Sequence, residues 1–415
     1  MNAAVRVFIF FSAGYFVSYI FRGLNIGFAP FLIDELNLSA GDLGTLTSLY
    51  FLGFAVTQIP AGAALDTWGP RRVTAALMVL AALGSVVFAL GDGLVPLMVG
   101  RILIGVGVAV CMGAALQALA QHFPAHRVAM LNGALIAIGG LGGALVGTPL
   151  ALVLEVATWR SVSIGMAVLT LVVAGLLWFG AVDAQKPKGA ASKSVRPSVW
   201  AQFRGTWHLL CSSRFWKLSL FPSVSGGMFY AVQSLWMKPY LLDVNQAGLV
   251  QTDALVSLVG LSAVCGSLVS GVLARRVERL GMSLTMFCGL CLAVFVGVQG
   301  LIMLDAPIPK SVLWGSFGLF GACCVLVFAI FVVRYPPAMW GRVNTTFNML
   351  VFFMIFAVQN AIGWIVELWP PIAQGVYPAQ AHLTAWIAML AVQTLCAVWY
   401  FWPEGLRQPV HTEAA

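Results

Sequence analysis

The stretch "DAQKPKGAASKSVRPS", residues 183–198, interrupts a chain that is otherwise strongly apolar. It consists mainly of Lys, Ser, Pro and Ala without any aromatic residue, which is typical of a flexible linker in water. Six long apolar runs precede it and six follow it. The sequence therefore predicts a first membrane bundle at 1–182, a cytosolic linker at 183–214 and a second bundle at 215–415.

The composition places these runs in a lipid bilayer. Of the 415 residues, 60% are hydrophobic and only 9% are charged, whereas a water-soluble domain is about 25% charged. The runs are long enough to cross about 30 Å of hydrocarbon as helices, and too uniformly apolar for the strands of a membrane barrel. We expect an all-α integral membrane protein with twelve transmembrane helices. The predicted spans are 6–29, 43–64, 73–91, 94–119, 128–152, 160–181, 216–241, 252–274, 282–304, 311–333, 343–368 and 382–403.

The basic residues predict the orientation. Of the 22 Lys and Arg residues, Arg22 and Arg101 lie within predicted spans; with both termini in the cytosol, 17 of the other 20 fall on the cytosolic side. The three on the outside are Arg160, Lys238 and Lys310. We therefore expect a multi-pass protein of a bacterial inner membrane with cytosolic termini. The net charge of +8 follows from this topology and from attraction to anionic lipid, without a nucleic-acid partner.

Two polar segments of the first half have counterparts about 210 residues later, which indicates an internal repeat. "FPAHRVAMLN" (123–132) corresponds to "YPPAMWGRVN" (335–344), and "GAALDTWGPRR" (62–72) corresponds to "GVLARRVERLG" (271–281). Because the copies run in the same direction, they predict two transporter halves related by an axis along the membrane normal.

The segment 62–72 resembles the cytosolic loop signature of the major facilitator superfamily, G-x-x-x-D-x-x-G-R-[RK], with Pro70 displacing the basic pair by one position. The matching residues are Gly62, Asp66, Gly69, Arg71 and Arg72. Residues 101–107 resemble the R-x-x-x-G-x-G element of the same superfamily, and Trp159-Arg160 resembles the usual entry to its sixth span. The resemblance covers nearly the whole chain and implies two pseudo-symmetric six-helix bundles.

The loop signature predicts a conformational latch. The Asp66 carboxylate can pair with basic residues and with the positive N-terminus of a neighbouring helix in the outward-open state only, which would shift a two-state equilibrium. Alternatively, Arg71 and Arg72 only obey the positive-inside rule. In the second half Arg275 replaces the carboxylate, so a latch there would be weaker or differently built. The resemblance assigns Arg101 to helix packing or proton coupling.

"SYIFRGLNIGF" (18–28) places Arg22 deep inside the first span. A charge at this depth costs about 2.5–3.5 kcal/mol on insertion scales, so such residues face a cavity or a partner. Ser12, Tyr15, Tyr19 and Asn25 share one helical face with it, and the spans contain no acidic residue at depth. We therefore predict that the missing partner is an anionic small-molecule substrate, bound through the guanidinium fork. The alternative is that Arg22 binds backbone carbonyls or water.

The superfamily resemblance implies a substrate site at the midplane between the halves. Side chains on faces of the first, seventh and eleventh spans predict its lining: Tyr19, Arg22, Asn25, Tyr230, Gln233, Trp236, Asn348 and Gln359. Phe352 follows the same helical spacing, and Gln58 and Gln117 are weaker candidates. Each of these could instead serve only to join helices.

The predicted function is secondary active transport of a small organic anion, by uptake and alternating access. The chain has no G-x-x-x-x-G-K-[ST] loop for ATP, and we expect no enzyme activity, cofactor or metal. A monomer would couple transport to protons as a symporter, exchange the substrate for a counter-anion, or facilitate its flow. The alternative is proton-coupled efflux of drugs or metabolites; against it, Thr148 splits the Gly-Pro pair that efflux proteins have in the fifth span. A non-transporting receptor on the same fold is a third possibility.

Overall fold

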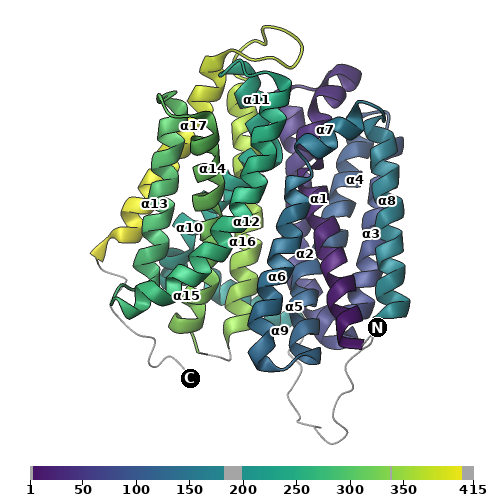
Figure 1. Cartoon of the computed structure of the whole chain (residues 1–415), viewed down its shortest axis with the longest axis vertical. Coiled ribbons are helices and arrows are strands. Elements are labelled where there is room, and N and C mark those ends of the chain that lie inside the picture. The colour runs from purple at the N-terminus through teal and green to yellow at the C-terminus, as the bar shows by residue number, and fades with distance from the viewer. Residues whose placement is uncertain (1–2, 182–198, 337–338, 404–415) are drawn as a thin grey trace, which may run out of the picture.

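The computed structural model describes residues 3–181, 199–336 and 339–403. In these ranges the chain is helical apart from turns and one isolated bridge between Ala373 and Val376. Figure 1 shows two groups of helices standing side by side. The predicted helical membrane architecture is therefore confirmed.

The first group contains the helices of the first six predicted spans. They are α1 (Ala3–Leu36), α2 (Ala40–Trp68), α3 (Pro70–Leu90), α4 (Leu94–Val108), α5 (Cys111–His122), α6 (Ala125–Ala144), α7 (Thr148–Leu154), α8 (Trp159–Gly175) and the π-helix η1 (Leu176–Gly180). Helices α4 and α5 form one long span, whereas α6 and α7 are bent by 43° at the break between them.

The second group begins after the predicted linker residues 183–198, which lie outside the described residues. Its helices are α9 (Val199–Leu210), α10 (Ser213–Ala231), the π-helix η2 (Val232–Trp236), α11 (Met237–Asp243), α12 (Leu249–Arg279), α13 (Leu284–Met303), α14 (Lys310–Gly321), the 3₁₀-helix η3 (Ala322–Val325), α15 (Leu326–Arg334), α16 (Trp340–Val366) and α17 (Ala379–Phe401). Helix α9 lies within the segment predicted as linker.

Each predicted span coincides with a helix or with consecutive helices. By length and composition, ten helices of the described chain can cross a membrane, or 11 if the bent pair α6 and α7 is one span. The remaining predicted span, 216–241, is helical as α10, η2 and α11, but it is less apolar, because serines, glycines and Gln233 occupy its centre.

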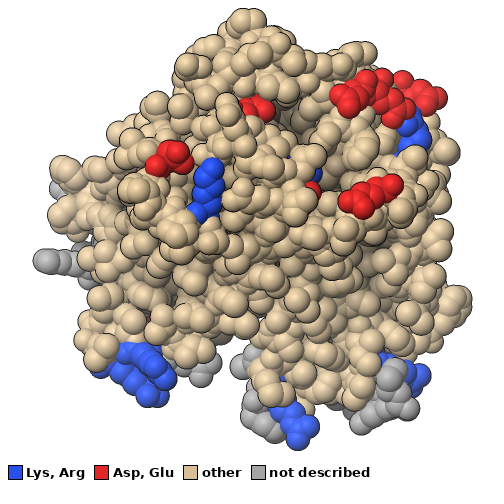
Figure 2. Space-filling view, turned by 45° about the horizontal axis from the view of Figure 1, so that its top comes forward, with Lys and Arg blue, Asp and Glu red and all other residues tan. Residues whose placement is uncertain are grey.

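Figure 2 shows the acidic side chains toward one end of the bundle, together with a few basic ones, and basic side chains at the other end. We call one the basic end; it carries the turns after α2, α12 and α15, with Arg71, Arg72, Arg276, Arg279, Arg334 and Arg342. The opposite, acidic end carries Glu35, Asp92, Glu155, Asp305 and Glu367. By the positive-inside rule the basic end is expected in the cytosol.

The turn between α2 and α3 explains why the loop signature departs from the superfamily pattern. Gly69 has φ 83°, in the region that favours glycine, and its N–H donates to the Leu65 carbonyl 3.0 Å away. Pro70 is the first residue of α3, where its missing N–H is not needed. The inserted proline therefore restarts the helix at once and moves the basic pair by one residue.

Glycines of the R-x-x-x-G-x-G element allow α4 to pack closely against its neighbours. A Cβ on Gly105 would lie 2.0 Å from the Tyr50 carbonyl oxygen of α2, and one on Gly107 would lie 2.4 Å from the Ala81 nitrogen of α3. Small residues let helix backbones approach in this way inside membranes. This part of the element therefore has a packing role.

A buried amide pair joins α13 to α17 and gives a first prediction. Gln299 and Gln393 are fully buried and donate to each other, with both Nε2–Oε1 distances 3.0 Å. Gln299→Leu should lower the free energy of unfolding by about 1–2 kcal/mol, because it leaves the Gln393 amide without its partner. Thermal unfolding in detergent should show a smaller loss of stability for the variant with leucine at both positions than for Gln299→Leu alone. Equal losses of stability would mean that the two amides are not coupled.

Candidate functional site

Arg22 lies where the two groups of helices meet, and it is 8% exposed. Its guanidinium carbon is 4.4 Å from the ring centre of Tyr19 on α1 and 6.0 Å from that of Phe54 on α2. The rings of Tyr230 and Phe352, on α10 and α16, are each 5.2 Å away. We call Tyr19, Phe54, Tyr230 and Phe352 the aromatic box; each half of the chain contributes two of its rings.

The charge of Arg22 is not neutralised by a side chain in the described ranges. No acidic side chain pairs with its guanidinium there. The Tyr50 hydroxyl lies within hydrogen-bonding reach of the guanidinium, and the Arg22 Nε is buried without a partner. Rings within about 6 Å of a cation attract it, but they accept no conventional hydrogen bond from its N–H groups. The N–H edge of Arg22 is therefore available for a ligand.

The aromatic box is closed by a contact between α2 and α16. The rings of Phe54 and Phe352 stack with centres 3.8 Å apart and an angle of 15° between their planes. Phe51 also contacts Phe352, at 6.2 Å between ring centres. Such pairs contribute about 0.5–1.5 kcal/mol beyond the area that they bury, so the box also holds the halves together.

Arg101 differs from Arg22 in its surroundings. It is 1% exposed, its Nη1 donates to the Phe21 carbonyl at 3.2 Å, and its guanidinium lies 5.1 Å from the Tyr50 ring centre. The Tyr50 hydroxyl in turn donates to the Ser18 carbonyl at 3.3 Å. Arg101 therefore joins α4 to α1 and α2 inside the first group of helices.

A second group of predicted site residues lies between Arg22 and the acidic end. Asn25 donates through Nδ2 to the Thr47 hydroxyl at 2.8 Å, and Trp236 donates through Nε1 to the Gln359 carbonyl at 3.1 Å. The Asn25 Oδ1 and both amide atoms of Gln359 are buried without a described partner. We call Asn25, Thr47, Trp236 and Gln359 the polar layer.

The remaining candidates lie elsewhere. Asn348 donates to the Gln58 Oε1 at 3.0 Å across the two halves, and Gln58 donates to the Ala109 carbonyl at 3.2 Å. Gln233 is half-buried on η2 with no hydrogen bond to a described residue, and Gln117 lies on α5 with its Oε1 buried and unpaired. In this conformation Asn348 and Gln58 bridge helices rather than face Arg22.

Two residues of α2 were not among the sequence candidates. Phe54 belongs to the aromatic box and Thr47 to the polar layer. Together with Phe51 and Gln58 they recur at intervals of three or four residues, so they share one face of α2. That spacing, continued from Gln58 along α2, would have identified both.

The two halves are hydrogen-bonded to each other mainly at the acidic end. Asn360 of α16 accepts from the Thr45 hydroxyl at 2.8 Å and pairs with the Ser48 hydroxyl at 2.6 Å. The Thr148 N–H of α7 donates to the Ser257 hydroxyl of α12 at 3.0 Å. These contacts close the bundle on this side of Arg22.

The loop between α16 and α17 extends this closure. Gln374 donates to the Asn37 Oδ1 at 2.9 Å, and the Tyr377 hydroxyl accepts from the Ala40 N–H at 3.1 Å. Of the hydrogen bonds that join α1–α8 to α10–α17 within the described ranges, none lies nearer the basic end than the Asn348–Gln58 bridge. The structure is therefore closed at the acidic end.

The predicted latch is not engaged in this conformation. The Asp66 carboxylate is exposed and makes no ion pair with a described residue, while the Arg71 Nη1 donates to the Trp178 carbonyl of η1 at 2.7 Å. A latch that forms only when the acidic end is open would be released here, so its role stays a prediction.

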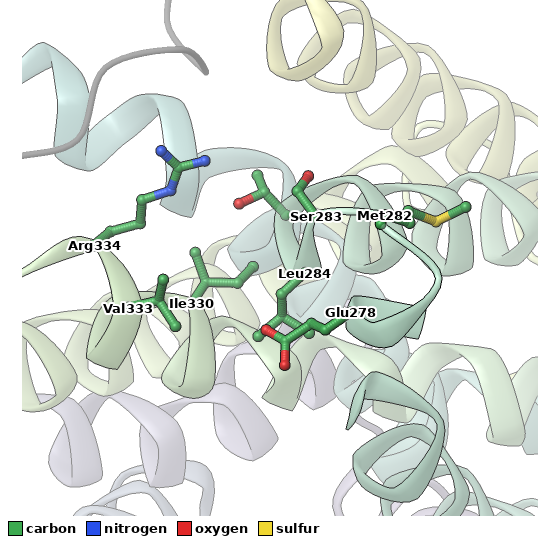
Figure 3. Close-up of a pocket in the computed structure, with 9 residues that line it drawn as sticks. Glu278, Met282, Ser283, Leu284, Ile330, Val333 and Arg334 are labelled. Carbon is green, nitrogen blue, oxygen red and sulfur yellow. The ribbon is translucent and has the colours of Figure 1, made fainter. Parts of the chain in front are cut away.

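A separate cavity of about 390 Å³ lies at the basic end, between the α12–α13 turn and α15. Figure 3 shows Glu278 and Arg334 on different sides of it. It belongs to the repeat copy of the loop signature, where Glu278 supplies a carboxylate three residues after Arg275. Its position at the end of α15 separates it from the aromatic box.

Comparison with known proteins identifies the fold family. The sequence profile of the "Major Facilitator Superfamily" matches residues 11–359. Among solved structures, a bacterial homologue of the human lysosomal transporter Spinster superimposes with a TM-score of 0.75 at 16% identity, over 97% of both chains. A D-xylose-proton symporter superimposes with a TM-score of 0.71 at 15% identity, over 99% of both chains.

Curated relatives are membrane transporters. The probable sulfoacetate transporter of Cupriavidus necator is 26% identical over 303 residues, which cover 71% of this chain and 69% of the relative. The hexuronate transporter of Bacillus subtilis is 25% identical over 319 residues, covering 73% and 74%. The probable L-galactonate transporter of Escherichia coli is 22% identical over 363 residues, covering 84% and 77%.

Proposed function

We propose that this chain, which belongs to the major facilitator superfamily of membrane transporters, carries a small organic anion across the membrane by alternating access. The observation that carries the proposal is the Arg22 guanidinium, buried between the halves with its Nε unpaired and no acidic partner among the described side chains. An oxyanion would supply both the missing charge and the missing acceptors. The chain is thus a transporter and not an enzyme.

The aromatic box fits a carboxylate or a similar group. A guanidinium with rings on its faces presents only its edge, and that edge offers two parallel N–H groups to two oxygens. Tyr19, Tyr230 and Phe352 would cover the apolar part of the bound molecule. Asn25, Gln233, Trp236, Asn348 and Gln359 complete the proposed site. The printed names of three relatives, transporters of sulfoacetate, hexuronate and galactonate, support an anionic substrate.

For transport, we propose that residues 1–182 and 215–415 move against each other about the site, joined by 183–214. Opening of the acidic end would break the contacts between α2 and α16 and engage the latch of Gly62, Asp66, Gly69, Arg71 and Arg72. The protein would act as a monomer in a bacterial inner membrane and take the anion up. Since the described spans hold no acidic side chain beside Arg22, coupling would use protonation of the substrate or exchange against a counter-anion.

Uptake into proteoliposomes tests this function directly. Purified protein should accumulate at least one radiolabelled organic acid from a panel of L-lactate, D-gluconate, D-glucuronate and succinate, above the level of protein-free vesicles. D-glucose, which is neutral, should not enter faster than into those vesicles. Uptake of D-glucose but of no acid would contradict an anion transporter.

A further inference from the structure

The contacts around Arg22 also limit the kind of anion that can bind, and this inference rests on the proposed function. We infer that the substrate carries a single negative charge and has hydroxyl groups at the end away from its oxyanion. Three features of the site point to this class of anion: the cations near it, the distance between the aromatic box and the polar layer, and the hydrogen-bonding atoms left unpaired in that layer.

Among the buried cations of the described chain, Arg22 is the one that lies beside rings of both halves. Arg101 also has an unpaired Nε and Nη2, but it lies against the Phe21 carbonyl and the Tyr50 ring inside the first group of helices. Lys238 pairs with Asp253 at 2.9 Å, and Lys217, at the start of α10, donates to the Trp399 and Trp402 carbonyls at the end of α17. A second carboxylate bound between the halves would therefore be buried without a counter-charge, which is strongly unfavourable.

Helix geometry gives the distance from the aromatic box to the polar layer. Phe352 precedes Gln359 by seven residues on α16, and Thr47 precedes Phe54 by seven on α2. Seven residues are two helical turns, roughly 10 Å. On both helices the residue of the polar layer lies on the acidic side of the residue of the aromatic box. The Arg22 side chain points back along α1, toward Tyr19, because helical side chains tilt toward the N-terminus.

The two unpaired amides of the polar layer lie at the same level. Asn25 is bonded to Thr47, and Gly44, one turn away on the same face of α2, lies beside Gln359: a Cβ on Gly44 would be 3.1 Å from the Gln359 carbonyl oxygen. A molecule that contacts both the N–H groups of Arg22 and the unpaired amides of the polar layer would have an extended chain of about four to six carbons.

The unpaired atoms identify the chemistry at the far end of that chain. Asn25 Oδ1 and Gln359 Oε1 are acceptors that need donors, and Gln359 Nε2 needs an acceptor; Asn25 and Gln359 are fully buried. A hydroxyl group both donates and accepts, whereas a carboxylate only accepts and would face two acceptor oxygens. Each buried unpaired atom costs about 1–3 kcal/mol, so a hydroxylated end would gain from pairing them.

Six-carbon compounds that differ in one property at a time test the inference on the purified protein. D-gluconate, D-galactonate and D-glucuronate have one charge and several hydroxyls; D-glucarate adds a second charge, hexanoate lacks hydroxyls, and D-glucose lacks the charge. Titration calorimetry at pH 7 should show at least one of the three hydroxylated monoanions binding at least tenfold more tightly than hexanoate or D-glucarate. D-glucose should not bind measurably.

Variants assign the preference to the polar layer. Gln359→Leu should weaken binding of the preferred hydroxy acid about tenfold and leave the Kd of hexanoate unchanged, which also shows that the variant is folded. Gln251→Leu, the same exchange at an exposed position of α12, should change neither. The comparison of ligands on the parent protein needs no variant and stands even if Gln359→Leu does not fold.

The outcomes separate this inference from the proposed function. If hexanoate or D-glucarate binds as tightly as every hydroxylated monoanion, and Arg22→Gln abolishes that binding, the inferred substrate class is wrong while the anion site stands. If no compound binds in a way that depends on Arg22, the proposed function itself fails, and the inference with it.

Discussion

Arg22→Gln should abolish binding and transport of the organic anion. The substitution keeps a polar side chain of similar length but removes the charge and the paired N–H groups at the centre of the aromatic box. Hydrogen bonds to a charged group contribute about 1.5–3 kcal/mol each, so losing two of them should weaken binding by at least about a hundredfold. Titration of the purified variant and uptake into proteoliposomes both measure this effect.

Two further variants control for charge and for general damage. Arg22→Lys keeps the charge but not the fork, and it should recover only part of the affinity. Arg160→Gln removes an arginine that pairs with Glu35 and Asp92 at the acidic end, and it should bind the anion as the parent does. Transport by Arg22→Gln at the parental rate would remove the basis of the proposed site.

The second large effect is expected at Gly260, on the seam between α12 and α6. A Cβ at this position would lie 2.9 Å from the Ala144 Cα and 3.0 Å from the Ala144 nitrogen, and these backbone atoms cannot rotate away. Gly260→Leu should therefore disfavour the conformation that is closed at the acidic end by at least about 1–3 kcal/mol, which corresponds to about a tenfold or greater loss of its population.

Labelling from the acidic side measures this shift. Ser48 is fully buried in the closed conformation. In a background with the exposed Cys211 and Cys265 changed to serine, a cysteine at position 48 should react with an impermeant maleimide much faster in Gly260→Leu than in the parent. Gly297→Leu is the matched control, because a Cβ at Gly297 meets no atom within 4 Å. Equal labelling in all three proteins would show that the seam does not control access.

The sequence predicted most of the fold because the bilayer leaves few choices. An apolar run of about 20 residues must satisfy its own backbone hydrogen bonds, so the run at 73–91 could hardly be anything but the helix Pro70–Leu90. The bend of 43° between α6 and α7 was not predicted. It depends on how the glycines before Thr148 pack against α12, which is a contact between distant parts of the chain.

The candidate site, too, could be predicted only in part from the sequence. Arg22 stands out in the sequence because a cation in hydrocarbon needs an explanation, and the structure places Tyr19 and Tyr230 beside it. The bond from Asn348 to Gln58 could not be predicted, because it depends on the register of α16 against α2. Helical spacing within one span shows which residues share a face, but not which face of another span lies opposite.

The position of the Arg22 guanidinium between the halves affects how the protein should respond to membrane potential. A monoanion bound to Arg22 makes the centre of the loaded carrier neutral, while the empty carrier returns with a net positive centre. Moving one elementary charge through 100 mV is worth about 2.3 kcal/mol, so voltage should act mainly on the empty return step. The membrane potential would then determine the side of the membrane to which the empty site is open. It would have little effect on the conformational change of the loaded protein.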